Sequence, residues 1–158
     1  MAGQVVIIMG SKSDLEHVHK ITAHLEELGV PYRLRVASAH KSVRHLLSLL
    51  EEYERAREPL VYITVAGRSN ALGGMVDANT RWPVITCPPI SSTFAGADIY
   101  SSLRMPSGVA PLVVLEPGNA ALAAAKLLAL ADPALAQRVA AYQEERRQEV
   151  IQADESLA

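Results

Sequence analysis

Val6-Ile7-Ile8-Met9-Gly10-Ser11-Lys12-Ser13-Asp14 is the stretch that decides the fold, because an apolar run ends there in a glycine and a set of polar residues. The run is typical of a buried strand, and the polar residues are typical of a loop that opens a helix. Comparable runs recur along the chain, at Val5–Met9, Leu34–Ala37, Leu60–Val65, Val84–Cys87 and Leu112–Leu115. The segments between them mostly have helical spacing of apolar residues, so the sequence predicts a parallel α/β sheet wrapped by helices.

Capping residues and stop signals place the first two predicted helices. Ser13 and Glu16 have the spacing of a capping box, and Gly29 is a typical stop, so we expect a helix over about 13–28. Apolar residues at helical spacing predict a second helix over about 43–57.

The C-terminal part of the chain predicts two more helices. Asn119 can cap an alanine-rich helix that ends at Ala131, and Asp132-Pro133 is a typical start for the next one. This last helix, over about 133–153, becomes rich in Glu, Arg and Gln and extends beyond the pattern of the sheet. It lies solvated on the surface or packs on another subunit, and we favour the subunit contact.

Length and composition indicate one globular domain over residues 1–158, with a core at about 4–131. The chain has 158 residues, of which 49% are hydrophobic and 20% are charged, as is ordinary for a folded domain. Its net charge of -2, without a cluster of Lys and Arg among aromatics, argues against a nucleic-acid partner. No apolar run approaches the roughly 18 residues that span a bilayer. With one cysteine, Cys87, and no signal-peptide pattern, we expect a cytoplasmic protein.

Ligands of such sheets collect at the carboxyl ends of the strands, where helix N-termini present free N–H groups. The first loop there, Gly10-Ser11-Lys12-Ser13-Asp14, offers a glycine turn, two hydroxyls, an ammonium and a carboxylate. This composition suits a phosphate site, although it lacks the glycine spacing of a Walker loop or a dinucleotide fingerprint. Ser13 and Asp14 can equally act as helix caps alone, so both interpretations stay open.

The second loop, Ser38-Ala39-His40-Lys41-Ser42, places a titratable base beside a cation. Histidine is suited to moving protons near neutral pH, and a neighbouring ammonium favours its neutral, proton-accepting form. His40 is therefore the best catalytic candidate. The other histidines fall within predicted helices, where a structural role is the simpler interpretation; they are His17, His19, His24 and His45.

The third loop, Ala66-Gly67-Arg68-Ser69-Asn70, follows the third strand, and Gly73-Gly74 continues its small residues into the next helix. Arg68 can hold a carboxylate or a phosphate. Alternatively, the glycines let the helix approach the sheet while Arg68 pairs with an acid such as Asp77.

The stretch from Cys87 to Gly108 is rich in proline, serine and glycine, which predicts a long loop with a functional role. Cys87 itself ends a strand before two prolines, so we interpret it as a small buried residue rather than a nucleophile.

Taken together, these loops resemble the PurE family of aminoimidazole ribonucleotide carboxylases and mutases over nearly the whole chain. Three stretches carry the resemblance, namely Val6 to Asp14, Ser38 to Lys41, and Ser102-Leu103-Arg104-Met105-Pro106-Ser107-Gly108. It implies a three-layer α/β/α, flavodoxin-like fold and a homo-octamer with active sites at subunit interfaces, which would account for the projecting C-terminal helix.

The resemblance also implies roles for individual residues. Ser11, Ser38 and Lys41 would help to hold the phosphate of the ribonucleotide, Asp14 would bind the ribose hydroxyls, and His40 would be the general acid and base. The complete set of candidate site residues is Gly10, Ser11, Asp14, Ser38, Ala39, His40, Lys41, Gly67, Arg68, Ser69 and Asn70.

The third loop separates the two branches of this family. Mutases typically carry Ala-Gly-Gly-Ala-Ala-His-Leu-Pro-Gly there, whereas this chain has Gly67-Arg68-Ser69-Asn70 followed by Ala71 in place of a second histidine. Lys41, where mutases usually have arginine, also resembles the carboxylase branch. We therefore expect carboxylation of 5-aminoimidazole ribonucleotide (AIR) with carbon dioxide, yielding 4-carboxy-5-aminoimidazole ribonucleotide (CAIR), without ATP, metal or another cofactor.

Three alternatives stay open. The first is the mutase of the same family, which rearranges the N5-carboxyaminoimidazole ribonucleotide, the carbamate isomer of CAIR. The second is a nucleotide-binding module without catalytic activity. The third, a flavin-binding electron carrier, fits less well, because the chain has one Trp and one Phe to flank an isoalloxazine.

Overall fold

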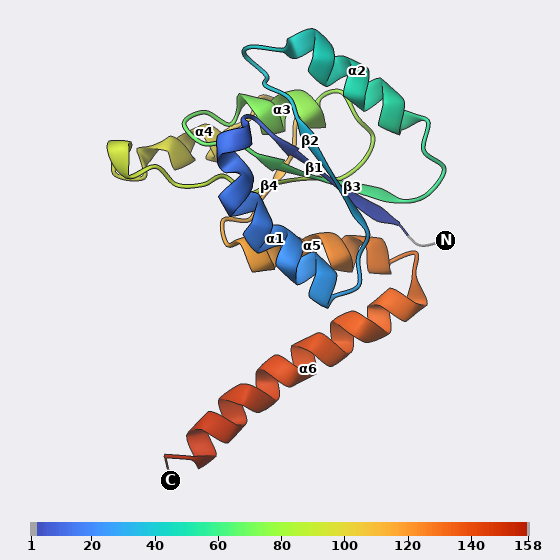
Figure 1. The fold of residues 1–158 in the computed structure, drawn as a ribbon, viewed down its shortest axis with the longest axis vertical. Helices are drawn as coiled ribbons and strands as arrows, with labels where there is room; N and C mark the ends of the chain where they lie inside the picture. The colour runs from blue at the N-terminus through green and yellow to red at the C-terminus, as the bar shows by residue number, and fades with distance from the viewer. Residues whose placement is uncertain (1–2, 158) are drawn as a thin grey trace.

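The computed structural model describes residues 3–157 and contains a five-stranded, all-parallel sheet in the order β2-β1-β3-β4-β5 (Figure 1). This is the flavodoxin-like order, as the family resemblance implies. The strands are β1 (Gln4–Met9), β2 (Tyr32–Val36), β3 (Leu60–Val65), β4 (Val84–Thr86) and β5 (Leu112–Val113). The chain leaves β1 for β2 on one side and then returns to β3 on the other, so the strand order reverses beside β1 and opens a crevice there.

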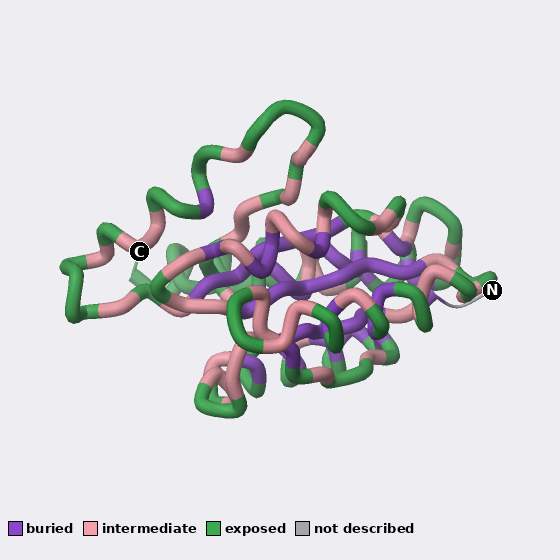
Figure 2. The backbone as a smooth tube through the Cα atoms, turned by 90° about the horizontal axis from the view of Figure 1, so that it is seen from above, coloured by how far each residue is buried: buried purple, intermediate pink, exposed green. Residues whose placement is uncertain are grey.

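Helices cover both faces of the sheet and complete the three layers that the sequence predicts (Figure 1). Helices α1 (Leu15–Glu27) and α5 (Pro117–Ala129) pack on one face, and α2 (Val43–Glu54) and α3 (Ala71–Asp77) pack on the other. Because side chains alternate along a strand, β1 contributes to both hydrophobic cores. Its residues Val5 to Met9 are buried, and Figure 2 shows buried segments running through the middle of the molecule.

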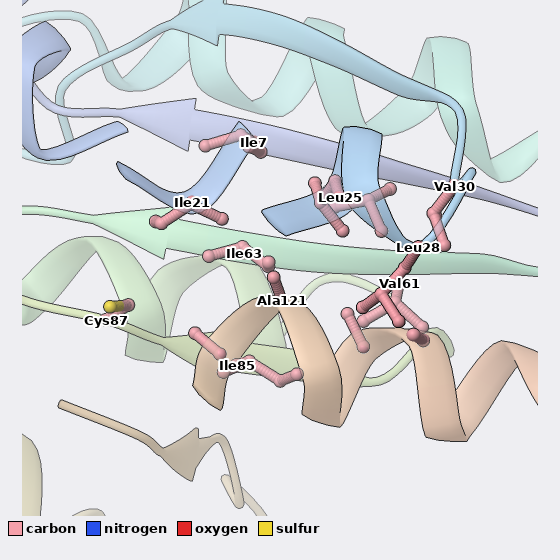
Figure 3. Packing of buried hydrophobic residues seen from close by; sticks show 14 of the residues in the cluster. Ile7, Ile21, Leu25, Leu28, Val30, Val61, Ile63, Ile85, Cys87 and Ala121 are labelled. Atoms are coloured by element: carbon pink, nitrogen blue, oxygen red, sulfur yellow. The ribbon is translucent and has the colours of Figure 1, made fainter. Parts of the chain in front are cut away.

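The larger core lies between the sheet and the pair α1 and α5. Figure 3 shows Ile7, Ile63 and Ile85 from three neighbouring strands together with Ile21 and Leu25 of α1 and Ala121 of α5. The buried alanines of α5 let this helix approach the strands closely; they are Ala120, Ala121, Ala124 and Ala125. This packing holds the first strand-to-helix loop against the rest of the sheet.

The last helix, α6 (Pro133–Glu155), projects away from the sheet (Figure 1). Its start agrees with the sequence, because the Asp132 carboxylate accepts a hydrogen bond from the backbone N–H of Leu135 at 3.1 Å. Near this start, Leu135 and Val139 are buried against the core, whereas Val150 and Ile151 near the other end are exposed. No helix within residues 3–157 is long and apolar enough to cross a membrane.

Two predicted helix starts are wrong. Ser11, rather than Ser13, is the capping residue, because Ser11 leaves β1 with an extended backbone and opens a short 3-10 helix, Lys12–Asp14, that precedes α1. Its partner in the capping box is Asp14 instead of Glu16.

At α5, the carboxylate of Glu116 accepts the N–H of Asn119, so the helix starts at Pro117 and Asn119 lies inside its first turn. Helix α2 also ends at Glu54, three residues before the expected end at Arg57. The segment after β4 contains short helices where the sequence predicted a long loop, namely Ser92–Phe94, Ala97–Ile99 and α4 (Tyr100–Leu103).

Candidate functional site

The loops after β1, β2 and β3 surround one cavity of about 540 Å³ at the carboxyl ends of the strands. Ten of the eleven candidate residues line it, which are Gly10, Ser11, Asp14, Ser38, Ala39, His40, Lys41, Gly67, Arg68 and Ser69. The structure adds Ser13, Ala66 and Leu72 to the lining. The eleventh candidate, Asn70, lies outside this lining.

In the first loop, the same residues cap the helix and face the cavity. The backbone N–H of Ser11 donates to Oδ2 of Asp14 at 3.1 Å, and the hydroxyl of Ser11 accepts the N–H of Ser13 at 3.3 Å. The N–H of Gly10 donates to the carbonyl of Val65 at 2.9 Å, which ties the loop to β3. Partial burial raises the pKa of Asp14. The two interpretations of this loop are therefore compatible, because capping fixes its hydroxyls and carboxylate at the edge of the cavity.

The second loop is organised by two serines. The hydroxyl of Ser38 accepts the backbone N–H groups of His40 at 3.3 Å and Lys41 at 3.2 Å. The hydroxyl of Ser42 accepts the N–H of Ser38 at 2.8 Å and donates to the carbonyl of Ser38 at 3.3 Å. These bonds fold residues 38–42 into a compact turn that presents His40 and Lys41, both exposed, to the cavity.

The third loop contains a left-handed residue. Arg68 has a φ of 59°, and the N–H of Ser69 donates to the carbonyl of Gly67 at 2.6 Å, so the chain turns sharply here. A Cβ atom at Gly67 would lie 3.5 Å from both Cγ and the carbonyl oxygen of Pro89, which places the turn directly on that proline. The exposed Arg68 side chain is thus carried on a sharp turn at the rim of the cavity.

Asp77 does not serve Arg68 as an ion-pair partner. Oδ2 of Asp77 accepts the backbone N–H of Ala110 at 2.7 Å, and within residues 3–157 Arg68 forms no salt bridge. The structural alternative for Arg68 is therefore wrong, and its guanidinium is available to an anion in the cavity.

Asn70 caps the helix that follows the turn, α3. Its side-chain oxygen accepts the N–H of Gly73 at 3.1 Å and so caps α3, and the residue is only 3% exposed. A Cβ atom at Gly73 would lie 2.3 Å from Cγ2 of Thr86 and 2.6 Å from Oδ1 of Asn70. The glycine therefore allows α3 to approach the sheet, as the sequence suggests.

The remaining histidines lie within helices, as expected. Nε2 of His17 lies 3.1 Å from the carbonyl oxygen of Cys87, directly after the end of β4. Burial lowers the pKa of His17. Cys87 is buried, and burial raises the pKa of its thiol to about 12. A thiol that stays protonated at neutral pH is a poor nucleophile, which agrees with the structural role expected for Cys87.

The assembled site offers an anion and polyol pocket with a proton carrier at its rim. Lys41 and Arg68 supply positive charge, Asp14 supplies a carboxylate, and His40 supplies an imidazole. Four serine hydroxyls complete the polar lining, from Ser11, Ser13, Ser38 and Ser69. Within residues 3–157 there is no group of three or more His, Cys, Asp or Glu that could hold a metal ion.

Sequence and structural comparisons identify the group of proteins to which this site belongs. The family model described as AIR carboxylase matches residues 4–149. The phosphoribosylaminoimidazole carboxylase of Treponema denticola is 52% identical over 153 residues, covering 97% of this chain and 96% of that protein. A protein of the same name from Archaeoglobus fulgidus is 54% identical over 154 residues, covering 98% of this chain and 84% of that protein.

A solved structure agrees with the sequence matches. The crystal structure of Treponema denticola PurE has a TM-score of 0.96 to this chain at 51% identity, covering 98% of each chain. The chain therefore belongs to the AIR carboxylase, or PurE, family of purine biosynthesis.

Proposed function

We propose that the protein carboxylates AIR with free carbon dioxide to form CAIR, without ATP or another cofactor. The observation that carries the proposal is the position of His40, which lines one cavity together with the hydroxyl-rich loop of Ser11 and the turn of Arg68. A ribonucleotide that spans this cavity would have its phosphate and its reacting ring at different loops. The cytoplasmic location expected from the sequence is part of the proposal.

The first two loops suit the ribose phosphate of AIR. Lys41 provides a cation for the phosphate, and the hydroxyls of Ser11 and Ser38 are held by backbone N–H groups. Because each of these hydroxyls already accepts from the backbone, its own hydrogen can be donated to a phosphate oxygen. Asp14 would accept hydrogen bonds from the ribose hydroxyls.

The chemistry needs positioning and one proton carrier. The electron pair of the enamine-like ring forms a bond from carbon 4 to the carbon of carbon dioxide, while one C=O π pair moves to oxygen and gives a carboxylate. Carbon 4 is then tetrahedral and bears both hydrogen and carboxylate. His40 takes the proton, and the C–H electron pair restores the aromatic ring. Holding the reactants at near-attack distance is the main contribution of the cavity.

Arg68 and Ser69 would receive the new carboxylate. The guanidinium of Arg68 can form charge-assisted hydrogen bonds to it, and the tight turn at Gly67 brings backbone groups to the same rim of the cavity. Groups that are fixed before the reaction stabilise developing charge without reorganisation.

The choice of carbon dioxide over a carbamate rests on the third loop and on the relatives. Ala71, the first residue of α3, stands where the mutase branch has a second histidine. The two bacterial and archaeal relatives are named carboxylases. The mutase of the same family is the second candidate, because both activities would use His40 and the same nucleotide pocket.

We further propose that the protein, a single domain over 1–158, forms a homo-octamer in which α6 contacts another subunit. Apolar side chains that stay exposed support an assembly of this kind. They occur at the far end of α6, at Val150 and Ile151, and on the segment after β4, at Ile90, Phe94, Tyr100 and Leu103.

The proposed activity is tested by giving the purified protein AIR and ¹³C-labelled bicarbonate, with carbonic anhydrase to maintain dissolved carbon dioxide. We expect ¹³C at the carboxyl of CAIR in the absence of ATP. Binding of AIR without labelled product would instead favour a nucleotide-binding module.

A further inference from the structure

A serine far along the chain holds the third loop of the site. The hydroxyl of Ser101, in α4, accepts the backbone N–H of Asn70 at 2.9 Å and donates to the carbonyl oxygen of Asp98 at 2.8 Å. Ser101 and Asn70 are 31 residues apart in the sequence. The bond therefore joins the segment after β4 to the residue that directly follows Ser69.

This link lies beside a turn whose backbone conformation is unusual for a residue other than glycine. Arg68 is a non-glycine residue with a φ of 59°, a conformation that persists only where the surroundings enforce it. On one side, Gly67 rests on Pro89. On the other side, Asn70 is fixed by its cap on α3 and by Ser101.

A small cavity separates the two segments around this link. It has a volume of about 10 Å³, and its walls include Arg68 and Ser69 from the turn and Asp98 and Ser101 from the later segment. A space of this size is at most enough for one water molecule, so the two segments lie close together here. The hydroxyl of Ser101 spans the gap by a direct hydrogen bond.

We propose that Ser101 is a positioning residue for the carboxylation, acting through Asn70 to hold Arg68 and Ser69 where the new carboxylate forms. This inference rests on the proposed function. Ser101 does not line the main cavity, so it would act only through the turn of Arg68 and Ser69. In the proposed function this turn meets the new carboxylate and not the phosphate, so the effect would fall on the carboxyl end of the substrate.

The test compares four variants of the full-length protein. Ser101→Ala and Ser101→Val remove the hydroxyl, and Ser101→Thr keeps it in the same shape as valine. Ser91→Ala is the matched control, because the hydroxyl of Ser91 accepts the N–H of Thr93 at 3.2 Å within the same segment, and no described bond joins it to the 66–70 turn.

We expect Ser101→Ala and Ser101→Val to lower kcat about tenfold, since a misplacement of about 1 Å can cost about 100-fold and the loss of one hydrogen bond should move the turn by less than that. KM for AIR should stay within about twofold, because the proposed contacts to the phosphate and the ribose, which are the same in the bound substrate and in the transition state, do not involve Ser101. Ser101→Thr and Ser91→Ala should behave like the unmodified protein. A threonine variant as slow as the valine variant, or equal losses in kcat and in AIR affinity, would overturn the inference in favour of a general structural role.

A binding measurement separates failure of this inference from failure of the proposed function. In a His40→Asn background, which blocks turnover, calorimetry compares the affinities of AIR and CAIR with and without Ser101→Val. We expect CAIR to bind more tightly than AIR, and this preference to shrink about threefold or more when the hydroxyl is removed. An unchanged preference contradicts the role of Ser101 alone, whereas failure to bind either nucleotide contradicts the proposed function.

Discussion

Residues 38–42 and residues 66–70 are neighbouring loops of one cavity, but they are held in different ways. The loop of His40 is folded by hydrogen bonds among its own residues, mainly through Ser38 and Ser42. The turn of Arg68 depends on Pro89, on Ser101 and on the close approach of α3 to the sheet. The proposed proton carrier, His40, is thus held by local bonds, while the groups that would meet the carboxylate depend on distant parts of the chain.

The largest expected effect lies in the locally held loop. His40→Asn should lower kcat by about 100- to 10,000-fold, the contribution typical of a general acid and base. AIR should still bind, because in the proposed function the phosphate and ribose contacts come from other residues. His45→Asn is the control, since His45 is an exposed histidine of α2. Full activity of His40→Asn would remove the proposed base.

The packing of α3 on the sheet, next to the turn of Arg68, is tested by Gly73→Ala. The new methyl group would collide with Thr86 and Asn70, so we expect the free energy of unfolding to fall by about 1–3 kcal/mol. Gly74→Ala is the matched control, because its methyl would meet the flexible thioether of Met105 at 3.2 Å. Chemical denaturation of both variants measures the difference, and equal stabilities would contradict the close approach of α3.

The proposed role of Lys41 in phosphate binding predicts a change in KM. Lys41→Ala should raise KM for AIR about tenfold, the effect of losing about 1.5 kcal/mol from a hydrogen bond to a charged group. Its effect on kcat should be small, since the phosphate does not react. Lys20→Ala, at an exposed lysine of α1, should leave KM unchanged. An unaltered KM in Lys41→Ala would place the phosphate elsewhere.

The smallest effect is expected from the serine that closes the local loop. Ser42→Ala leaves the N–H of Ser38 without its acceptor and should cost about 1 kcal/mol in unfolding free energy. Ser48→Ala, at an exposed serine of α2, should cost less, and Ser42→Thr should recover most of the loss. A loss in Ser48→Ala as large as in Ser42→Ala would show that the serine hydroxyl at 42 does not organise the loop.

The difference between the two loops also explains what could be predicted from the sequence. The sheet follows from apolar runs, and the loops that carry polar residues at the ends of those runs are the ones that meet at the cavity. The sequence placed Ser42 in the second loop but did not predict that it bonds to the backbone of Ser38. A serine four residues after Ser38 is a local signal from which this bond could have been predicted. Ser101 had no local signal, because its partner Asn70 is distant in the sequence.

The errors in the helix starts have a similar physical origin. More than one residue near each start can cap a helix, and the sequence alone does not show where the strand ends and the extended backbone of a cap begins. Ser11 leaves β1 with φ −152° and ψ 152°, which makes it the cap two residues before Ser13. At α5, Pro117 fits the first turn, so the cap is Glu116 rather than Asn119.

The central claim is that this site uses free carbon dioxide, and one isotope experiment tests it most directly. The protein is given the unlabelled carbamate isomer in a buffer whose dissolved carbon dioxide is fully ¹³C-labelled and rapidly equilibrated by carbonic anhydrase. If the protein is a carboxylase, CAIR should form only as the carbamate decays to AIR, and its carboxyl should carry the label of the pool. Rapid formation of unlabelled CAIR would mean direct transfer from the carbamate and would contradict the account.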